Sequence, residues 1–399
     1  MTQIEPAESA VTFNPFEPGF AEDPYPQYQA LREADPVHQS VVGPWYLTRY
    51  DDVMRLLRDP GLSVEDRNAH PTPLSEAFEA ALPEASAEPR ESLAMLNRDP
   101  PDHTRLRRLV SKAFTPRTVQ QLQPRVQALV DESLDAAEHN GGMELMGDFA
   151  FPLPFRVITE MMGMPETDAE ELRQLSGTLV RSLEPVLDPA TLQAIFDAGE
   201  TMHGLISEAI ETKRKAPADD LLSALIAAEE QGDVLSDDEL AEQVGLLYIA
   251  GHETTVNLIG NGVLALLRNP EQLAALREDP ELTANAVDEL LRYDGPVQMS
   301  RRITLGEVEI GERTIEPGAF VVVALAAANR DPAHFGPDAD CLDLARSDAN
   351  THLSFGGGHH YCLGAALARL EAQTAIGTLV RRFPHIEPTT APTWNGRIN

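Results

Sequence analysis

A stretch of about 32 residues in the second half of the chain predicts one long helix that must lie inside the protein. It begins at Ser236-x-x-Glu239, a capping box in which the two side chains satisfy free backbone N–H groups, and Asn269-Pro270 ends it. At 1.5 Å per residue such a helix is about 48 Å long. Between Val244 and Leu267 it is apolar on nearly every face. We therefore predict that it crosses the interior of the protein.

Small and polar residues interrupt this helix at its centre, in residues 250–255 (AGHETT). Glycine and threonine are poorer helix formers than alanine and leucine, so their position in a buried helix points to chemistry. Gly251 would leave room for a bound diatomic molecule. Thr254 could hydrogen-bond that molecule, and Glu253 could relay protons from solvent. Thr254 and Glu253 are therefore the predicted catalytic residues.

Three other interpretations of this helix can be tested against its amino-acid sequence. A zinc-protease motif, HExxH, fails because its last position is Val256. A dinucleotide fingerprint at Gly260-x-Gly262-x-x-Ala265 would lie inside a helix instead of after a strand. A simple helix kink caused by glycine and threonine remains as the structural alternative.

A second informative stretch, residues 355–364, reads F-G-x-G-x-H-x-C-L-G and precedes a predicted helix. Cys362 would lie at the N-terminus of that helix, where free N–H groups and the helix dipole favour a thiolate. A thiolate there is a metal ligand or a nucleophile. The glycines let the backbone approach a flat object closely. Phe355 could cover the sulfur and exclude water.

This stretch resembles the haem-binding loop of the cytochrome P450 monooxygenases, in which a cysteine thiolate holds the iron. The resemblance implies a mainly α fold with a small β portion. It also implies that Cys362 is the axial ligand of haem b, bound between the central helix and the Cys362 loop. The other residues that it places at the haem are Ala250, Gly251, Phe355, Gly356, His360 and Gly364.

Three alternatives for Cys362 depend on the residues around it. A lone cysteine is most often a small buried apolar residue. His352, His359 and His360 could suggest zinc or copper, but no second CxxC, HxxxH or downstream ligand follows. A covalently attached haem would need CxxCH, which is absent.

The segment from Arg98 to Arg117 contains six basic and two acidic residues, in a chain of net charge −33. An ordinary explanation is a solvated helix face with ion pairs. The segment DPPDHTRLRRLVSKAF also resembles a helix of the same family. That resemblance implies that His103 and Arg107, one helical turn apart, hold haem propionates. It implies that Arg105, Arg108 and Lys112 face an acidic redox partner.

Further family positions follow in the C-terminal half. Glu289 and Arg292, three residues apart, resemble the family's structural ion pair, although such a pair is a weak signal by itself. Arg302, rather than Arg301, aligns with a propionate-binding position. Cys341 stands where the family usually has an arginine that joins the pair, so either another residue supplies that charge or the network is looser. Leu247, Ala250, Val297 and Met299 are predicted to line the substrate pocket, or else to belong to the core.

The remaining chain predicts a series of helices, with strands only near the two ends. Predicted helices cover residues 24–34, 51–59 (capped by Asp51), 118–138, 152–163, 167–182, 190–213, 219–230 and 281–293, and strands cover 41–48 (an edge strand), 307–310 and 320–325. Residues 60–95 and 183–189 predict loops that could act as substrate lids. Met161, Met162 and Met164 are predicted to pack in the core.

Composition limits the class of protein. The strong negative charge argues against nucleic acid and anionic membrane surfaces as partners. No apolar run approaches the ~18 residues of a membrane span, and the N-terminus resembles neither a signal peptide nor an anchor. Two cysteines, without a disulfide framework, fit a reducing cytoplasm. We expect one haem domain over residues 1–399, with residues 1–20 extended, a monomeric protein and a truncated C-terminal end.

The predicted function is that of a monooxygenase. With O2 as co-substrate it would hydroxylate or epoxidise a small-to-medium apolar substrate of secondary metabolism, such as a polyketide or macrolide, a terpenoid or a steroid. No flavin or nicotinamide domain fits in the sequence, so electrons from NAD(P)H should arrive through a ferredoxin reductase and a ferredoxin. A peroxygenase that uses hydrogen peroxide and a non-enzymatic haem protein remain as alternatives; Glu253 and Thr254 argue against the first.

Overall fold

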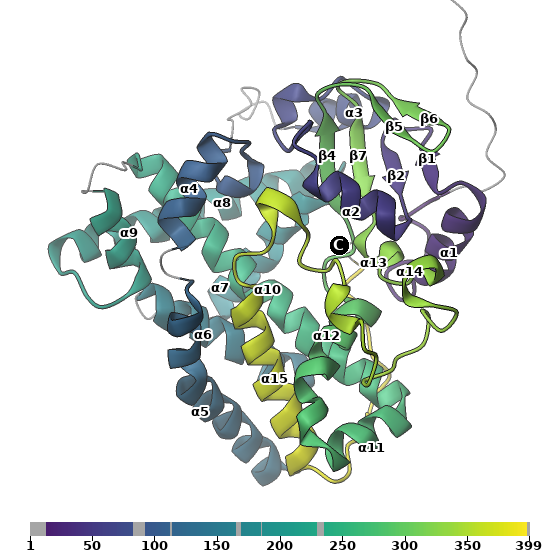
Figure 1. Cartoon of the computed structure of the whole chain (residues 1–399). Helices are drawn as coiled ribbons and strands as arrows, with labels where there is room; N and C mark the ends of the chain where they lie inside the picture. The colour runs from purple at the N-terminus through teal and green to yellow at the C-terminus, as the bar shows by residue number, and fades with distance from the viewer. Residues whose placement is uncertain are drawn as a thin grey trace, which may run out of the picture.

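The computed structural model describes residues 13–82, 92–111, 114–164, 169–184, 186–229 and 235–396. The protein is mainly helical, with a small β portion at the upper right of Figure 1, as predicted. The longest helices are α5 (Pro116–Asn140), α8 (Pro189–Lys215) and α10 (Asp237–Arg268). Figure 1 shows the molecule tapering toward the ends of α5, α11 and α15 (Ala365–Arg382).

Helix α10 is the central element, and its N-terminus is fixed by the predicted capping box. Glu239 N donates to Ser236 Oγ over 3.1 Å, and Ser236 N donates to Glu239 Oε2 over 2.8 Å. Helices α6 (Pro152–Met162), α8, α12 (Thr283–Asp294) and α15 pack around it. The largest apolar core of the protein lies between these helices. The prediction of a long interior helix is confirmed.

Other predicted helices are present with shifted ends: α1 (Tyr25–Ala34), α2 (Tyr50–Arg58), α4 (Asp102–Ser111), α7 (Ala169–Val180) and α9 (Leu221–Glu229). The sequence did not predict four further helices: α3 (Pro73–Ala81), α11 (Pro270–Glu278), α13 (Leu325–Ala328) and α14 (Pro332–Phe335). A π-helical turn, Leu145–Ala150, precedes α6. Met162 is fully buried in the main core, and Met161 and Met164 pack against it, as predicted.

The β portion is a five-stranded sheet of order β1-β2-β7-β4-β3 with a separate hairpin, β5-β6. Strands β2 and β7 are parallel, and the other pairs are antiparallel. The strands are β1 (Val37–Gln39), β2 (Trp45–Leu47), β3 (Leu62–Ser63), β4 (Ser300–Thr304), β5 (Val308–Ile310), β6 (Arg313–Ile315) and β7 (Phe320–Val323).

Two local predictions in the N-terminal part are wrong. Residues 41–48 do not form an edge strand: a turn at 40–44 separates β1 from β2, and β2 lies inside the sheet between β1 and β7. Asp51 does not cap α2, because the N-cap residue is Arg49 and no side chain caps that end. The apolar face of α2 is as predicted, with Val53, Leu56 and Leu57 buried.

The predicted loop at 60–95 contains more structure than expected. It holds β3, a 3-10 turn at Asp66–Asn68 and α3, which starts with a capping box between Thr72 and Ser75. Local capping bonds of this kind are easily missed in a segment rich in Pro, Ala and Ser. Residues 83–91 lie outside the described part of the chain, as does Pro185 in the second predicted lid, so both lids stay predictions.

Residues 13–20 were predicted to be extended but fold back onto the protein. Phe13 and Phe20 are buried in an aromatic cluster with Tyr28, and the Phe13 and Tyr46 ring centroids lie 4.7 Å apart. Aromatic packing therefore fixes this segment to α1 and β2. Among the described residues, no helix is both long and apolar enough to span a bilayer.

Candidate functional site

The loop from Phe355 to Cys362 is closed by its own backbone and rests on the end of α2. Cys362 N donates to Phe355 O over 2.9 Å. Gly356 and Gly358 have positive φ values of 68° and 64°, which favour glycine. A Cβ on Gly358 would overlap the Leu57 carbonyl oxygen. The absence of a side chain at Gly358 therefore allows the loop to pack closely against α2.

Cys362 lies just before α15, whose N-cap residue is Gly364. Burial raises the pKa of Cys362, while the N–H groups of Gly364 and Ala365 and the charges of Arg107 and Arg369 lower it. The N–H groups act as predicted, but burial prevails, so the polypeptide by itself does not favour the thiolate. Coordination to a metal cation would remove the proton.

Four nitrogen-bearing side chains from three separate segments gather beside this loop. His103 and Arg107 come from α4, Arg302 from β4, and His360 from the loop itself. The rings of His103 and His360 lie 4.3 Å apart, centroid to centroid. Arg107 Nη2 donates to the carbonyl oxygen of Tyr361 over 2.7 Å. The structure thus brings together His103, Arg107 and Arg302, whose predicted partners are propionates, with His360, which was predicted to lie at the haem.

The electrostatics of this group indicate a site for anions. Burial, together with Arg107 and His359, lowers the pKa of His103 to about 4. Burial, together with His103, Arg302 and Arg107, lowers the pKa of His360 to about 3. Within the described part of the chain no carboxylate is hydrogen-bonded to these four groups, and the buried His103 Nδ1 has no partner. Donors collected in this way fit the carboxylates of a haem.

Arg301 and Arg302 have different surroundings. Arg301 forms an ion pair with Asp66 and donates to Asn97. Arg302 is 5% exposed and donates to Arg301 O over 2.6 Å and to Ser300 Oγ over 3.1 Å. Burial lowers the pKa of Arg302 to about 10. The choice of Arg302 over Arg301 from sequence agrees with this difference.

The centre of α10 combines an exposed residue with polar groups. Ala250 is exposed although most of its helix is buried, and Thr254 Oγ1 donates to Ala250 O over 3.1 Å. Glu253 is partly buried. A Cβ on Gly251 would lie 2.9 Å from Ile158 Cδ1, so this glycine is needed for the packing of α10 against α6. The predicted role of Gly251 beside a diatomic molecule stays a prediction. Ala250 lies one helical turn before Thr254.

The residues predicted to line the substrate pocket lie in different parts of the core. Leu247 belongs to the main helical core, Val297 packs against the core under the sheet, and Met299 packs against the N-terminal aromatic cluster. Only Ala250 is exposed among the four. A common pocket for these residues stays a prediction.

Glu289 and Arg292 form a fully buried ion pair, and a third residue joins it. Arg292 Nε and Nη2 contact the two Glu289 oxygens over 2.6 and 2.8 Å, and both side chains are 0% exposed. Arg346 Nε donates to Glu289 Oε1 over 3.3 Å. Arg346 therefore supplies the third charge, which is the first of the two alternatives that Cys341 left open. The motif DLAR346 was the signal that could have located it.

This network is connected to the Cys362 loop through one asparagine. Arg292 Nη1 donates to Asn329 O over 2.9 Å. Asn329 Oδ1 accepts from Leu353 N over 2.7 Å, and Asn329 Nδ2 donates to Ser354 Oγ over 2.8 Å. The ion pair is thus linked to the residues that lead into the loop.

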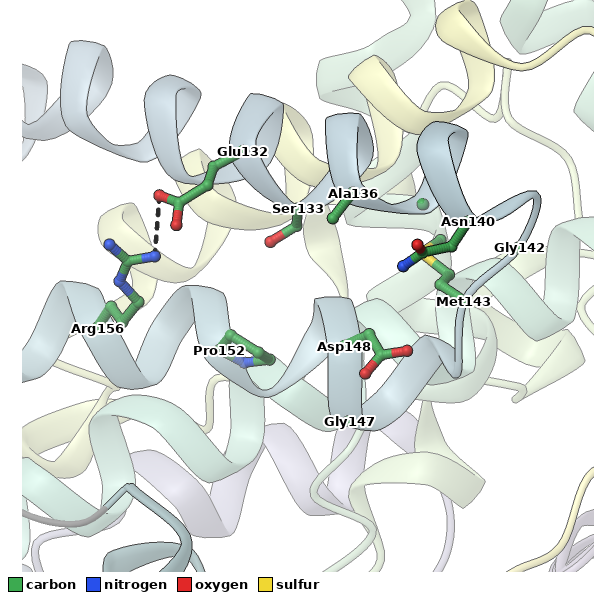
Figure 2. Close-up of a pocket in the computed structure, with 11 residues that line it drawn as sticks. Glu132, Ser133, Ala136, Asn140, Gly142, Met143, Gly147, Asp148, Pro152 and Arg156 are labelled. Carbon is green, nitrogen blue, oxygen red and sulfur yellow. Dashed lines mark hydrogen bonds and ion pairs between the residues drawn. The ribbon is translucent and has the colours of Figure 1, made fainter.

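Two surface pockets are prominent, and the predicted site residues contribute to only one of them. The pocket in Figure 2, of about 400 Å³, lies between α5 and α6, where Arg156 pairs with Glu132 over 3.0 Å. The other, of about 540 Å³, opens beside the loop and is lined by Phe355, Gly356 and Tyr361 among others. Among the described residues, no cluster of three or more His, Cys, Asp or Glu side chains could hold a metal ion.

Comparison with known proteins identifies the family. Residues 72–395 match the cytochrome P450 family. The chain is 43% identical over 386 residues to cytochrome P450 107B1 of Saccharopolyspora erythraea, covering 94% of this chain and 92% of that protein. It is 44% identical to vitamin D(3) 25-hydroxylase of Pseudonocardia autotrophica, over 92% and 88% of the two chains. Among solved structures, cytochrome P450 PksS of Bacillus subtilis matches with a TM-score of 0.85 and 36% identity, over 97% and 96%.

These matches define an oxidoreductase that uses haem iron and O2. The chain belongs to the cytochrome P450 family and is a monooxygenase, similar to enzymes of bacteria. The residues described above fit the group that this family binds: one sulfur at a helix start, donors for two carboxylates, and an exposed position on the central helix.

Proposed function

We propose that this enzyme binds haem b through Cys362 and hydroxylates or epoxidises a small-to-medium apolar substrate of secondary metabolism. The observation that carries this proposal is the gathering of the cations Arg107 and Arg302 with His103 and His360 beside the Cys362 loop; among the described residues, no carboxylate is hydrogen-bonded to any of the four. Burying like charges together is unfavourable unless an anion joins them. Haem supplies that anion through its two propionates.

Each part of the site has a distinct role in this proposal. Bound haem iron supplies O2 activation and the transfer of one oxygen atom to the substrate. Cys362 would hold the haem iron through its sulfur, and Phe355, Gly356 and Gly364 shape the surroundings of that sulfur. Thr254 donates a hydrogen bond on the side of α10 where Ala250 is exposed, and Glu253 exchanges protons with solvent. The polypeptide thus orients the substrate, times proton delivery and excludes water.

Electrons are proposed to come from NAD(P)H through a ferredoxin reductase and a ferredoxin. Arg108 is exposed on α4, on the same helix as the propionate-binding residues. Arg105 is less available than the sequence suggested, because it forms an ion pair with Glu239 at the start of α10. Lys112 lies outside the described part of the chain.

The substrate class is proposed from the names of relatives. One relative is a vitamin D(3) 25-hydroxylase, and another is the cytochrome P450 of a polyketide synthase. We therefore propose a polyketide or macrolide, a terpenoid or a steroid. Screening such compounds for a low-spin to high-spin shift of the haem, followed by product analysis with O2 and a ferredoxin system, tests this. Failure of every apolar class to shift the spectrum or yield product would contradict it.

Arg302→Gln is expected to weaken haem retention by roughly tenfold to a hundredfold, the effect of losing a charge-assisted hydrogen bond. The matched control is Arg301→Gln on the same strand, whose guanidinium pairs with the exposed Asp66. Haem transfer to apomyoglobin measures both variants. Equal loss rates for the two variants would mean that Arg302 does not hold a propionate.

Thr254→Ala is expected to separate electron use from product formation while preserving the haem spectrum. The fraction of electrons recovered in product should fall by about tenfold or more, because a positioned proton donor is lost. Thr201→Ala on α8 is the control, since Thr201 Oγ1 makes the same bond to the carbonyl four residues earlier, over 2.9 Å, at an exposed site. Unchanged coupling would exclude the proton role, and unfolding would favour a helix kink as the purpose of Thr254.

A further inference from the structure

Arg369 contacts the Cys362 loop from α15. It lies on the second turn of α15, and its guanidinium carbon is 4.6 Å from the centroid of the Phe355 ring. Arg369 and Tyr361 also line the same pocket beside the loop. Phe355 and Tyr361 are at the two ends of the loop, and the backbone of Phe355 accepts the Cys362 N–H. The guanidinium therefore contacts the first residue of the segment that carries the sulfur and shares a pocket with Tyr361 at its other end.

Arg369 is itself fixed by a carboxylate from another helix. Its Nε donates to Asp288 Oδ1 on α12 over 2.7 Å, and the two side chains are 25% and 16% exposed. The same oxygen faces His352 Nε2 at 3.4 Å. His352 Nδ1 accepts from Ser354 N over 3.1 Å, so its proton must lie on Nε2 and point to Asp288. Asp288 thus joins Arg369 to the start of the loop.

Arg369 affects the sulfur through its positive charge as well as through its contacts with the loop. Burial by itself would lower the pKa of Arg369, but Tyr361 and Asp288 raise it, so the group stays cationic. Arg369 lies over the ring of Phe355, whose backbone oxygen accepts the Cys362 N–H over 2.9 Å, so its positive charge is held close to the residue that carries the sulfur. Arg107 contacts the proposed propionate site, whereas Arg369 lies among the aromatic side chains of the loop.

We propose that Arg369, anchored by Asp288, is a positioning residue that sets both the placement of the Cys362 sulfur and the field that this sulfur feels. The proposal rests on the proposed role of Cys362 as iron ligand. The two roles differ: Cys362 is the ligand itself, whereas Arg369, which lies outside the loop, controls how strongly that ligand donates electron density to the iron. A positive charge near the sulfur withdraws electron density from the iron–sulfur bond and makes the iron easier to reduce.

The test compares Arg369→Gln, Arg369→Lys and Arg382→Gln in the haem-loaded protein. Arg382 is the matched control, because it lies on the same helix and pairs with the exposed Asp135 over 2.6 Å. Two quantities are measured: the reduction potential of the haem, and the lifetime of the thiolate-type absorption band of the reduced carbon monoxide complex.

Arg369→Gln should move the potential to more negative values and shorten the lifetime by roughly tenfold. Arg369→Lys keeps the charge but not the forked contacts, so its potential should stay near that of the wild type while the lifetime falls. Arg382→Gln should change neither. The inference is overturned if Arg369→Gln matches Arg382→Gln, or if Arg369→Lys lowers the potential as much as Arg369→Gln, which would indicate a structural role only.

Two further results keep the test decisive. If Arg369→Gln does not take up haem, Asp288→Asn removes the anchor while keeping the arginine: a shortened lifetime supports the proposal, and an unchanged one overturns it. If the wild-type protein lacks the thiolate-type band, the proposed role of Cys362 fails first, and that result is distinguishable from an effect confined to the Arg369 variants.

Discussion

Cys362→Ala is expected to abolish both the thiolate-type absorption of the reduced carbon monoxide complex and all monooxygenase activity. Cys362 is half-buried and lies just before α15, where the N–H groups of Gly364 and Ala365 lower the pKa of its thiol. A thiolate that donates electron density to iron is what favours O–O cleavage in this family. No other side chain of the loop offers an anionic sulfur.

The control for this variant is Cys341→Ala. Cys341 is exposed and contributes only its backbone carbonyl to the buried network, where it accepts from Arg292 Nη2 over 2.8 Å. Its replacement should leave the spectrum and the activity unchanged. A Cys362→Ala protein with the wild-type spectrum, or a wild-type protein that is colourless when purified, would end the haem-thiolate interpretation.

Arg292→Ala is expected to have the largest effect on stability, a loss of about 3–5 kcal/mol in the free energy of unfolding. The substitution leaves Glu289 fully buried, with the Asp343 N–H and the longer contact to Arg346 as its remaining partners. It also removes donors from the carbonyl groups of Asn329, Ala339 and Cys341. Urea unfolding monitored by circular dichroism measures the loss, and haem uptake should fail as the loop loses its support.

Arg125→Ala is the matched control for that experiment. Arg125 also makes two contacts with one carboxylate, Glu160, over 2.7 and 2.6 Å, but both side chains are more than two-fifths exposed. An exposed pair contributes about 0–1 kcal/mol. Equal effects of the two substitutions would show that burial of the Glu289 network does not support the fold.

The sequence predicted well the elements whose interacting residues lie close together along the chain. The capping box of α10 involves Ser236 and Glu239, three positions apart, and the Glu289–Arg292 pair has the same spacing. The Cys362 loop depends on glycines within a few residues of one another. In each case the interacting groups are neighbours along the chain, so the pattern alone carries the geometry.

The features that sequence missed depend on contacts between distant segments. Arg346 reaches Glu289 only because the loop after α14 folds back over α12. The close packing of Gly251 against the side chain of Ile158 involves another helix, and no pattern within α10 indicates it. The position of β2 inside the sheet is set by β7, which no local pattern around residue 45 could reveal.

The pairing of β2 with β7 also governs the order in which this protein can be assembled. Trp45 lies opposite Val321, so a strand made early in synthesis must wait for most of the remaining polypeptide before its partner leaves the ribosome. Helix pairs close in sequence can dock during that interval, whereas the entropy of so large a closure delays the sheet. Until then Leu47, which is completely enclosed in the finished protein, needs other cover, and chaperone binding would be concentrated on this N-terminal region of the nascent chain.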